Sequence, residues 1–168
     1  MDNYKIKKKF DFLDAQKRCY DYRRAILDMS QNVTALHAGG ALSSVEILDS
    51  IYFGMMNYSN NRFVDKFIMS KGHSCILQYV LLNKLGIISS RELNKYCKAG
   101  GKLGCHPDYG NPGIYASTGS LGHGMGLATG IAQAYKIQKS KKKIFLIISD
   151  GELQEGSTWE SMMMAANL

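Results

Sequence analysis

The chain has 168 residues, of which 45% are hydrophobic and 21% charged, a composition typical of one soluble globular domain that is long enough to bury a core. Its apolar runs are far shorter than a membrane span and its N-terminus lacks the apolar stretch of a secretion signal, so we expect a cytoplasmic protein without membrane association. The formal net charge of +7 includes lysine clusters at residues 5–9 and 139–143, and because no aromatic residues interleave with them, we expect solvated faces and no nucleic-acid binding.

The first predicted elements are two helices. In residues 12–30, apolar side chains recur at helical spacing with charged side chains between them, which indicates an amphipathic helix. Ser43 or Ser44 is then expected to cap a second helix that runs to about Met55, with Glu46 in its first turn.

A strand and two further helices follow. Residues 66–69 predict a short strand, and residues 74–85 predict a helix that Gly86 ends. Ser90 is expected to cap a short helix over residues 91–98. These patterns predict alternating helices and strands in this part of the chain.

A long loop and a glycine-rich helix come next. Residues 99–118 are rich in glycine and polar residues and contain both prolines of the chain, which predicts a functional loop. Residues 120–138 predict a helix that contains four glycines, Gly122, Gly124, Gly126 and Gly130. Each glycine costs roughly 1 kcal/mol relative to alanine, so an additional interaction must offset them. Either a cofactor at the helix start or close packing of the helix on a sheet would do so, and their spacing does not match a dinucleotide fingerprint.

The last predicted strand ends at a carboxylate. The unbroken apolar run at residues 144–148 predicts a buried parallel strand, and Asp150 and Gly151 follow at its carboxyl end, where open α/β sheets bind ligands. A carboxylate there suits Mg²⁺, which takes few protein oxygens and draws other ligands from water or phosphates. The pattern therefore predicts a metal-anchored diphosphate, followed by a helix over residues 155–168.

The four cysteines are Cys19, Cys75, Cys97 and Cys105, and no two of them form a Cys-x-x-Cys pair. In a chain without a secretion signal we expect free thiols in a reducing compartment. A zinc site made of Cys97, Cys105 and His106 is disfavoured because the spacing matches no common finger or ribbon.

Five blocks of the sequence resemble the transketolase family, in the order in which the family has them. Asp150-Gly151, followed by Glu155-Gly156 and Trp159-Glu160, resembles the thiamine diphosphate motif, and residues 117–124 resemble the glycine-rich loop that contacts the pyrimidine ring. The three blocks upstream are residues 37–43, 67–73 and 104–107. The resemblance runs from about Tyr20 to Leu168.

The resemblance implies an α/β fold with a doubly wound, mostly parallel sheet flanked by helices, which is the thiamine-diphosphate-binding fold. It implies one partial domain over residues 1–168, incomplete at its C-terminus, with residues 1–9 as a flexible basic segment. The family's second metal ligand, an asparagine, lies beyond Leu168, and its activating glutamate lies on another domain.

The resemblance also implies the roles of individual residues. His37 and His106 resemble histidines that face the first carbons of the ketose, and His73 resembles one that approaches the cofactor diphosphate. Glu155 resembles the acidic residue that links two active sites near the dimer interface. The implied catalytic residues are His37, His73, His106 and Glu155. The implied cofactor contacts are His73, Gly119, Ser120, Leu121, Asp150, Gly151 and Glu152, with Asp150 also the metal ligand. His123 occupies a position that is often glutamine in transketolases.

The function implied is that of a transketolase-like subunit that uses thiamine diphosphate and Mg²⁺ to transfer a two-carbon ketol unit between sugar phosphates. A partner chain with the pyrimidine-binding and C-terminal domains would complete a homo- or hetero-oligomer, and the chain alone would be inactive. One alternative is an enzyme similar to 1-deoxyxylulose-5-phosphate synthase, against which residues 117–122 favour transketolase. The other is a non-catalytic remnant or interaction module, which nothing in the sequence excludes.

Overall fold

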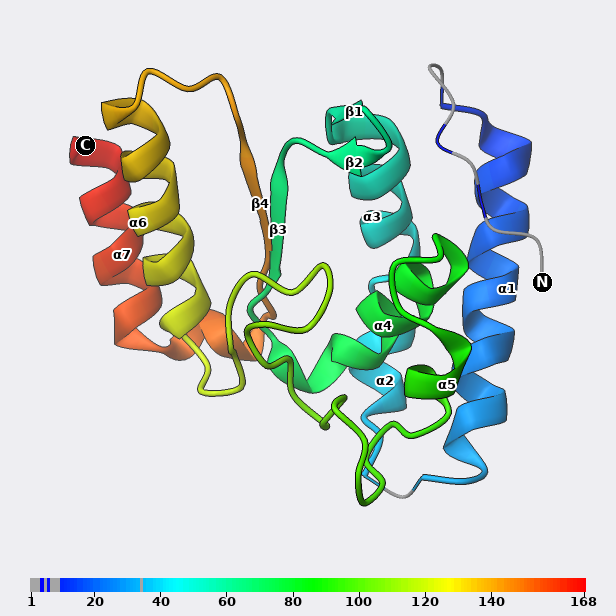
Figure 1. Ribbon diagram of the computed structural model, residues 1–168. Coiled ribbons are helices and arrows are strands. Elements are labelled where there is room, and N and C mark those ends of the chain that lie inside the picture. The colour runs from blue at the N-terminus through cyan, green and yellow to red at the C-terminus, as the bar shows by residue number, and fades with distance from the viewer. Residues whose placement is uncertain (1–3, 5, 7–9, 34) are drawn as a thin grey trace.

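The computed structural model describes residues 4, 6, 10–33 and 35–168, so most of the segment expected to be flexible, residues 1–9, lies outside the described part. This part forms a mixed α/β structure. Figure 1 shows the strand pair β3 and β4 between a larger group of helices and the helix pair α6 and α7. The helices are α1 (Phe12–Ser30), α2 (Ala38–Leu42), α3 (Val45–Ser50), α4 (Cys75–Lys84), α5 (Ser90–Leu93), α6 (His123–Ile137) and α7 (Gly156–Asn167). The strands are β1 (Tyr58–Ser59), β2 (Arg62–Phe63), β3 (Lys66–Met69) and β4 (Ile144–Ile147).

The strands form two small sheets. β3 and β4 are parallel, with Lys66 opposite Ile144 and Met69 opposite Ile147, which confirms the predicted parallel strand. The prediction that this strand is buried is wrong for most of β4. Only Ile147 is buried, because within the described residues β4 pairs with a neighbour on its β3 side alone. β1 and β2 form an unpredicted antiparallel hairpin.

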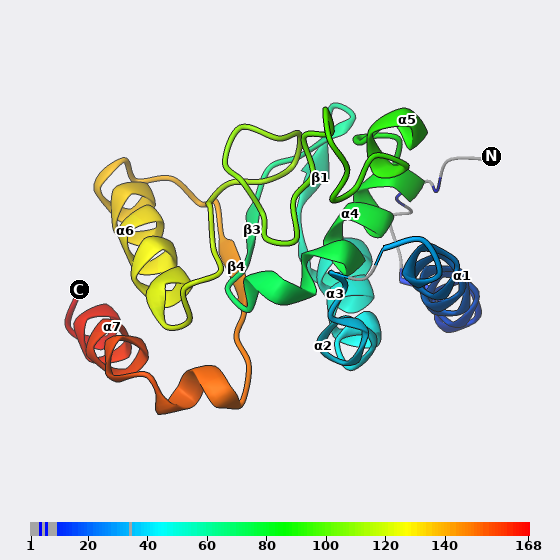
Figure 2. The same cartoon turned by 90° about the horizontal axis from the view of Figure 1, so that it is seen from below.

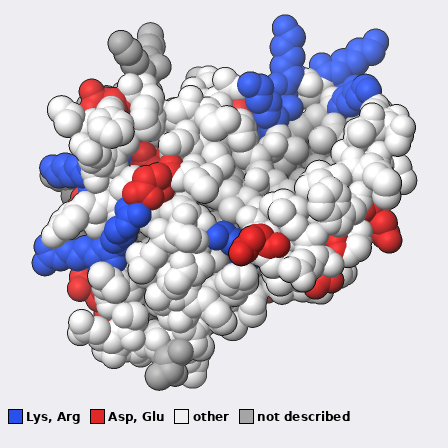
Figure 3. Space-filling view, turned by 180° about the vertical axis from the view of Figure 1, so that it is seen from behind, with Lys and Arg blue, Asp and Glu red and all other residues white. Residues whose placement is uncertain are grey.

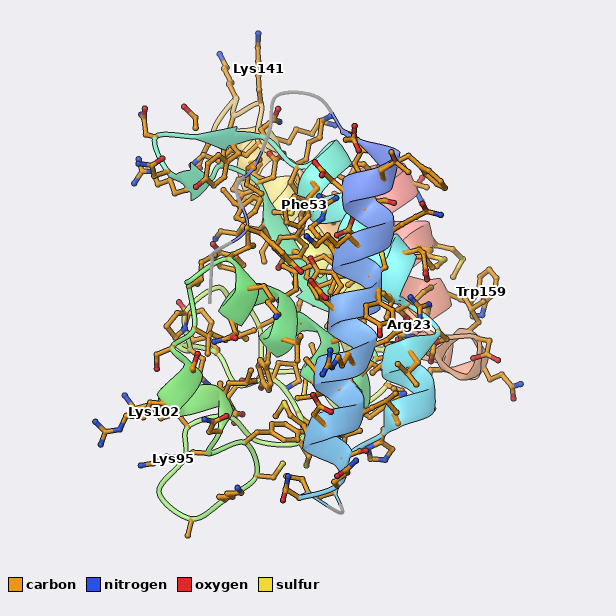
Figure 4. All side chains as sticks on the ribbon, turned by 90° about the vertical axis from the view of Figure 1, so that its right-hand side faces the viewer. Arg23, Phe53, Lys95, Lys102, Lys141 and Trp159 are labelled. Atoms are coloured by element: carbon orange, nitrogen blue, oxygen red, sulfur yellow. The ribbon has the colours of Figure 1, made fainter. Side chains whose placement is uncertain are left out.

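The core lies between α1, α3, α4 and β3. α4 is at its centre, and every residue from Cys75 to Leu82 is buried, as expected for a helix that is apolar on nearly all sides. α1 presents one face to this core and carries a buried ion pair there. Arg18 Nε donates to Asp49 Oδ1 (2.7 Å), and the guanidinium lies 3.9 Å from the ring centroid of Phe53. Figure 4 shows Phe53 beside α1.

The second predicted helix has the expected extent but not the expected cap. α3 continues as a π-helical turn, Ile51–Met55, and Ser44 precedes it. The Ser44 hydroxyl makes no cap hydrogen bond because it donates to the Gly40 carbonyl (3.3 Å) in α2. α2 itself was not predicted.

The remaining helices confirm the pattern with shifted ends. Gly86, with a φ of 74°, follows α4 in the left-handed conformation that ends helices. α5 ends earlier than predicted and its cap is Ser89 rather than Ser90, because the Ser89 hydroxyl accepts from the N–H of Glu92 (3.2 Å). Gly122, with a φ of 86°, cannot be helical, so α6 begins after it.

The basic side chains lie in separate groups. On the face shown in Figure 3, Lys and Arg are spread over several places, and one group lies where the connection between α6 and β4 is found. Figure 4 shows Lys95, Lys102 and Lys141 pointing away from the body of the molecule. No helix of the described part is long and apolar enough to cross a membrane.

Candidate functional site

The carboxyl ends of β3 and β4 lie side by side. The N–H of Ser70, which follows β3, donates to the Ile147 carbonyl of β4 (2.9 Å), so the parallel pairing extends past the end of β3. From there one segment continues through Lys71 toward α4, and the other continues through Asp150 toward α7 (Figure 2). The fold thereby joins two of the sequence blocks at one edge.

The glycine-rich loop lies against this edge. Residues 99–122 contain no helix or strand, which confirms the predicted long loop. Thr118 Oγ1 donates to the Met69 carbonyl of β3 (2.6 Å). A Cβ on Gly72 would lie 2.7 Å from the Thr118 carbonyl oxygen and 2.8 Å from the Gly119 nitrogen, so only glycine at position 72 lets the loop approach this closely.

Close packing accounts for two of the four glycines near the start of α6. A Cβ on Gly124 would lie 2.1 Å from Ser70 Oγ, and one on Gly122 would lie 2.2 Å from Ser157 Oγ. The packing explanation is therefore confirmed for Gly122 and Gly124. Gly130 has open space around it, and the cofactor explanation stays a prediction.

Three of the predicted catalytic residues gather at the same edge. The rings of His37 and His73 lie with centroids 5.4 Å apart. A Cβ on Gly119 would lie 2.8 Å from the His106 ring, so His106 contacts the glycine-rich loop. Burial lowers the pKa of His73, and electrostatic interactions with His37, Lys71 and His106 lower it further, against the opposing effect of Glu152. His73 therefore presents a neutral imidazole at pH 7.

Helix α4 holds the segment that carries His106. Tyr79 donates its hydroxyl to the His106 carbonyl (3.1 Å), and the Cys75 thiol donates to the Cys105 carbonyl (3.3 Å). Cys105 Sγ lies 3.3 Å from His106 Nδ1. Because Cys75 and Tyr79 are fully buried, the loop is fixed to the core just where it presents His106.

Lys71 is a site residue that the sequence analysis missed. It is 6% exposed, and its Nζ donates to the Gly40 carbonyl (2.9 Å) and to Ser43 Oγ (3.4 Å). Burial lowers the pKa of Lys71, and the charge of Asp150 acts in the opposite direction. The signal was its place between Ser70 and Gly72 in a block that resembles the family, but a lysine there had no assigned role.

The three residues after Ser149 lie in different surroundings. Asp150 is exposed, and its carboxylate makes no hydrogen bond or ion pair within the described residues. Gly151 has open space around it. Glu152, predicted as a cofactor contact, is 0% exposed. No group of three or more His, Cys, Asp or Glu residues in the described part could hold a metal ion.

The remaining predicted residues lie in or near a groove between α6 and α7. Its volume is about 490 Å³, and Ser120 and His123 line it. Leu121 is half-buried beside them, and its carbonyl oxygen lies 3.3 Å from His123 Nδ1. Glu155 is exposed at the start of α7, where its Cβ would meet a Cβ on Gly122 at 2.9 Å.

This arrangement defines a class of protein. A mixed α/β chain whose polar groups gather at the carboxyl ends of parallel strands binds its ligand at that edge. The family "Transketolase, thiamine diphosphate binding domain" matches residues 15–168. The chain therefore belongs to the transketolase family and forms its thiamine diphosphate binding domain, as the five sequence blocks predicted.

Similar proteins include subunits of transketolases. The chain is 39% identical over 159 residues to a subunit of the apulose-4-phosphate transketolase of Actinobacillus succinogenes, an alignment that covers 91% of this chain and 58% of that protein. It is 35% identical over 145 residues to the subunit of the same name from Phocaeicola vulgatus, covering 84% and 52%. The solved structure of transketolase from Campylobacter jejuni superposes with a TM-score of 0.83 at 27% identity, covering 92% of this chain and 26% of that one. The chain thus spans a little over half the length of the two relatives from divided transketolases.

Proposed function

We propose that this chain supplies the diphosphate and magnesium half of a thiamine diphosphate site in a two-chain transketolase that transfers a two-carbon ketol unit between sugar phosphates. The observation that carries the proposal is that Asp150, Lys71 and three histidines lie near one another at one strand edge. This edge offers a carboxylate to a metal, a buried cation to a phosphate and imidazoles to the hydroxyls of a sugar.

Asp150 is the proposed Mg²⁺ ligand. Its exposed carboxylate makes no hydrogen bond or ion pair among the described residues, and hard cations prefer such oxygens. Because Mg²⁺ keeps several ligands from water and phosphate, a single carboxylate from this part of the chain fits a metal that a diphosphate also holds.

The buried Ser74 hydroxyl, which has no hydrogen-bond partner in the described part and lies close to Gly40, adds an unused polar group near His73.

Several residues are proposed to hold the cofactor. When bound, thiamine diphosphate supplies the nucleophile and the electron sink for breaking a carbon–carbon bond. Lys71 would stabilise the diphosphate charge, and neutral His73 would donate a hydrogen bond to it without adding a charge of its own. The backbone of Gly119, Ser120 and Leu121 would face the pyrimidine ring, and Gly151 would leave room beside the diphosphate.

His37 and His106 are proposed to act on the substrate. Both lie in the same histidine group as His73, and an imidazole is the side chain that most often transfers protons in enzyme sites. The contact of His106 with Gly119 supports a position where the cofactor and the ketose would meet. Glu155, beside Gly122, would connect this site to the one in a second copy.

A partner chain is proposed to cover α6 and α7. The two relatives described above are each named as one subunit of a transketolase, which implies a second chain that would bring the pyrimidine-binding and C-terminal domains. Exposed apolar side chains on α6 and α7 support such a contact, namely Leu127, Ile137, Trp159, Met163 and Met164. Figure 4 shows Trp159 pointing outward from α7. We further infer that β3 and β4 are the first strands of a doubly wound, mostly parallel sheet.

The test is reconstitution. The chain would be combined with a candidate partner chain from the same genome, and thiamine diphosphate would be titrated by calorimetry with and without Mg²⁺. We expect saturable binding that requires Mg²⁺, together with ketol transfer from a ketose phosphate, and no activity from either chain alone. An assembly that forms but binds no cofactor with Mg²⁺ would refute the proposal.

A further inference from the structure

The fully buried carboxylate of Glu152 joins the segments that form the site. Glu152 Oε1 accepts hydrogen bonds from the Ser70 hydroxyl at the end of β3 and from the Gly122 N–H (2.8 Å) at the start of α6. Oε2 accepts from the Ser149 N–H (3.3 Å) at the end of β4. The Glu152 carbonyl also accepts from Thr158 Oγ1 (2.9 Å) in α7.

This set of donors suits an anion. A fully buried carboxylate is costly unless donors replace the lost water, and here a hydroxyl and two backbone N–H groups do so, with no ion-pair partner in the described part of the chain. A glutamine has only one acceptor oxygen, so it could serve either the Gly122 side or the Ser149 side but not both. The site therefore requires a carboxylate and not merely a side chain of this size.

The two segments joined in this way carry the proposed cofactor contacts. Ser149 immediately precedes Asp150, and Gly122 immediately follows Leu121. We propose that Glu152 is a positioning residue that holds the Asp150 turn and the glycine-rich loop in fixed relation, without touching the cofactor itself. This inference rests on the proposed function, and it replaces the expected direct contact of Glu152 with the cofactor by an indirect one.

The chain contains a matched control for this residue. Asp65 is also 0% exposed, and its carboxylate also accepts three hydrogen bonds, from the N–H and Nδ2 of Asn57 (2.8 and 2.9 Å) and from the N–H of Lys143 (2.8 Å). It lies at the opposite end of the same strand pair. Asp65→Asn therefore makes the same chemical change in the same kind of surroundings, away from the site.

The experiment compares Glu152→Gln and Asp65→Asn with the unmodified chain, with Ser70→Ala as a milder variant that removes a single donor. Urea unfolding measures stability, hydrogen exchange measures the protection of the Gly122 and Ser149 amides, and calorimetry of the assembly with its partner chain measures thiamine diphosphate binding with Mg²⁺. We expect Glu152→Gln to lower cofactor affinity by roughly 10- to 100-fold, the range for lost outer-shell partners. It should also speed exchange at one or both amides, while Asp65→Asn lowers stability similarly and leaves affinity unchanged.

Three results would overturn the inference. One is unchanged affinity in Glu152→Gln, and another is an equal loss in Asp65→Asn, which would reveal a merely structural role. The third is unchanged exchange at both amides in Glu152→Gln. That result would show that Glu152 does not hold the Asp150 turn and the glycine-rich loop together, whether or not the cofactor binds. If the unmodified assembly bound no cofactor, the proposed function would fail and the cofactor-positioning role with it. Faster amide exchange in Glu152→Gln and Ser70→Ala would then still support the structural part of the proposal, that Glu152 holds the two segments in fixed relation.

Discussion

The two ends of the β3–β4 pair each contain a buried carboxylate that accepts hydrogen bonds from neighbouring segments, but the two carboxylates join different segments. At the amino end, buried Asp65 accepts from Asn57 and Lys143 and so joins the segments that enter the two strands. At the carboxyl end, buried Glu152 accepts from Ser70 and Ser149 and so joins the segments that leave them. Each carboxylate satisfies backbone or side-chain donors that burial would otherwise leave unpaired.

The two ends differ in the polar groups that surround the buried carboxylate. All four histidines of the chain lie in the segments that gather at the carboxyl end, as do Lys71 and the exposed Asp150. The amino end instead carries the β1–β2 hairpin and the lysines of residues 139–143 (Figure 1). The comparison indicates that a buried carboxylate by itself marks structure, and that the histidines, Lys71 and Asp150 beside Glu152 distinguish the proposed site.

The largest expected effect is the difference in cofactor binding between Asp150→Asn and Asp65→Asn. Asp150→Asn should abolish measurable Mg²⁺-dependent binding of thiamine diphosphate in the assembly, because it removes the charge that the proposed metal requires. Its unfolding in urea should be unchanged, since the Asp150 side chain is exposed. Asp65→Asn should do the reverse, losing stability and retaining the cofactor. Both variants would be measured by calorimetry and by urea unfolding. Normal cofactor binding by Asp150→Asn would contradict this prediction.

The next effect concerns turnover at the carboxyl end. His37→Ala and His106→Ala should each lower kcat of the assembly by about 10²- to 10⁴-fold, the range for lost acid–base help, with little change in cofactor affinity. Lys95→Ala, whose side chain points into solvent in Figure 4, serves as the control with normal kinetics. Loss of cofactor binding with retained turnover would reject the assignment of these histidines to the substrate.

A smaller effect tests the packing of the glycines at α6. Gly122→Ala should destabilise the fold by about 1–3 kcal/mol, because its φ of 86° and the 2.2 Å approach to Ser157 Oγ both exclude a Cβ. Gly130→Ala, inside α6, adds a Cβ that meets nothing within 4 Å and should stabilise the fold by about 1 kcal/mol. Urea unfolding of both variants measures this, and equal effects would contradict the packing explanation.

Strong local patterns explain which features could be predicted. α1 and β3 have the predicted bounds because their apolar spacing matches the surfaces they bury, and Asp150 was predicted at a strand end because an apolar run precedes it. α2 could not be predicted, since its two glycines disfavour a helix. Gly40 is needed there because a Cβ at this position would lie 2.5 Å from Ser74 Oγ and 3.1 Å from the His73 ring. The burial of Glu152 and of Lys71 was equally out of reach, because segments distant in sequence, at Gly122 and Gly40, supply their partners.

The smallest effect is a pH dependence confined to the carboxyl end. Burial and electrostatic interactions with His37, Lys71 and His106 hold the pKa of His73 below its ordinary 6.5, against Glu152. Below pH 6.5 the unfolded chain therefore binds more protons at this residue than the folded chain. The contribution to stability is complete above pH 6.5 and is lost as the pH falls through the lowered pKa. Because His73 is partly exposed, solvent screening keeps this loss small. His73→Gln, which cannot be protonated, should show a flatter stability curve between pH 7.5 and 5 in urea unfolding. NMR titration of the His73 imidazole provides the direct check, and a midpoint at or above 6.5 would contradict the lowering of its pKa by burial and by the neighbouring side chains.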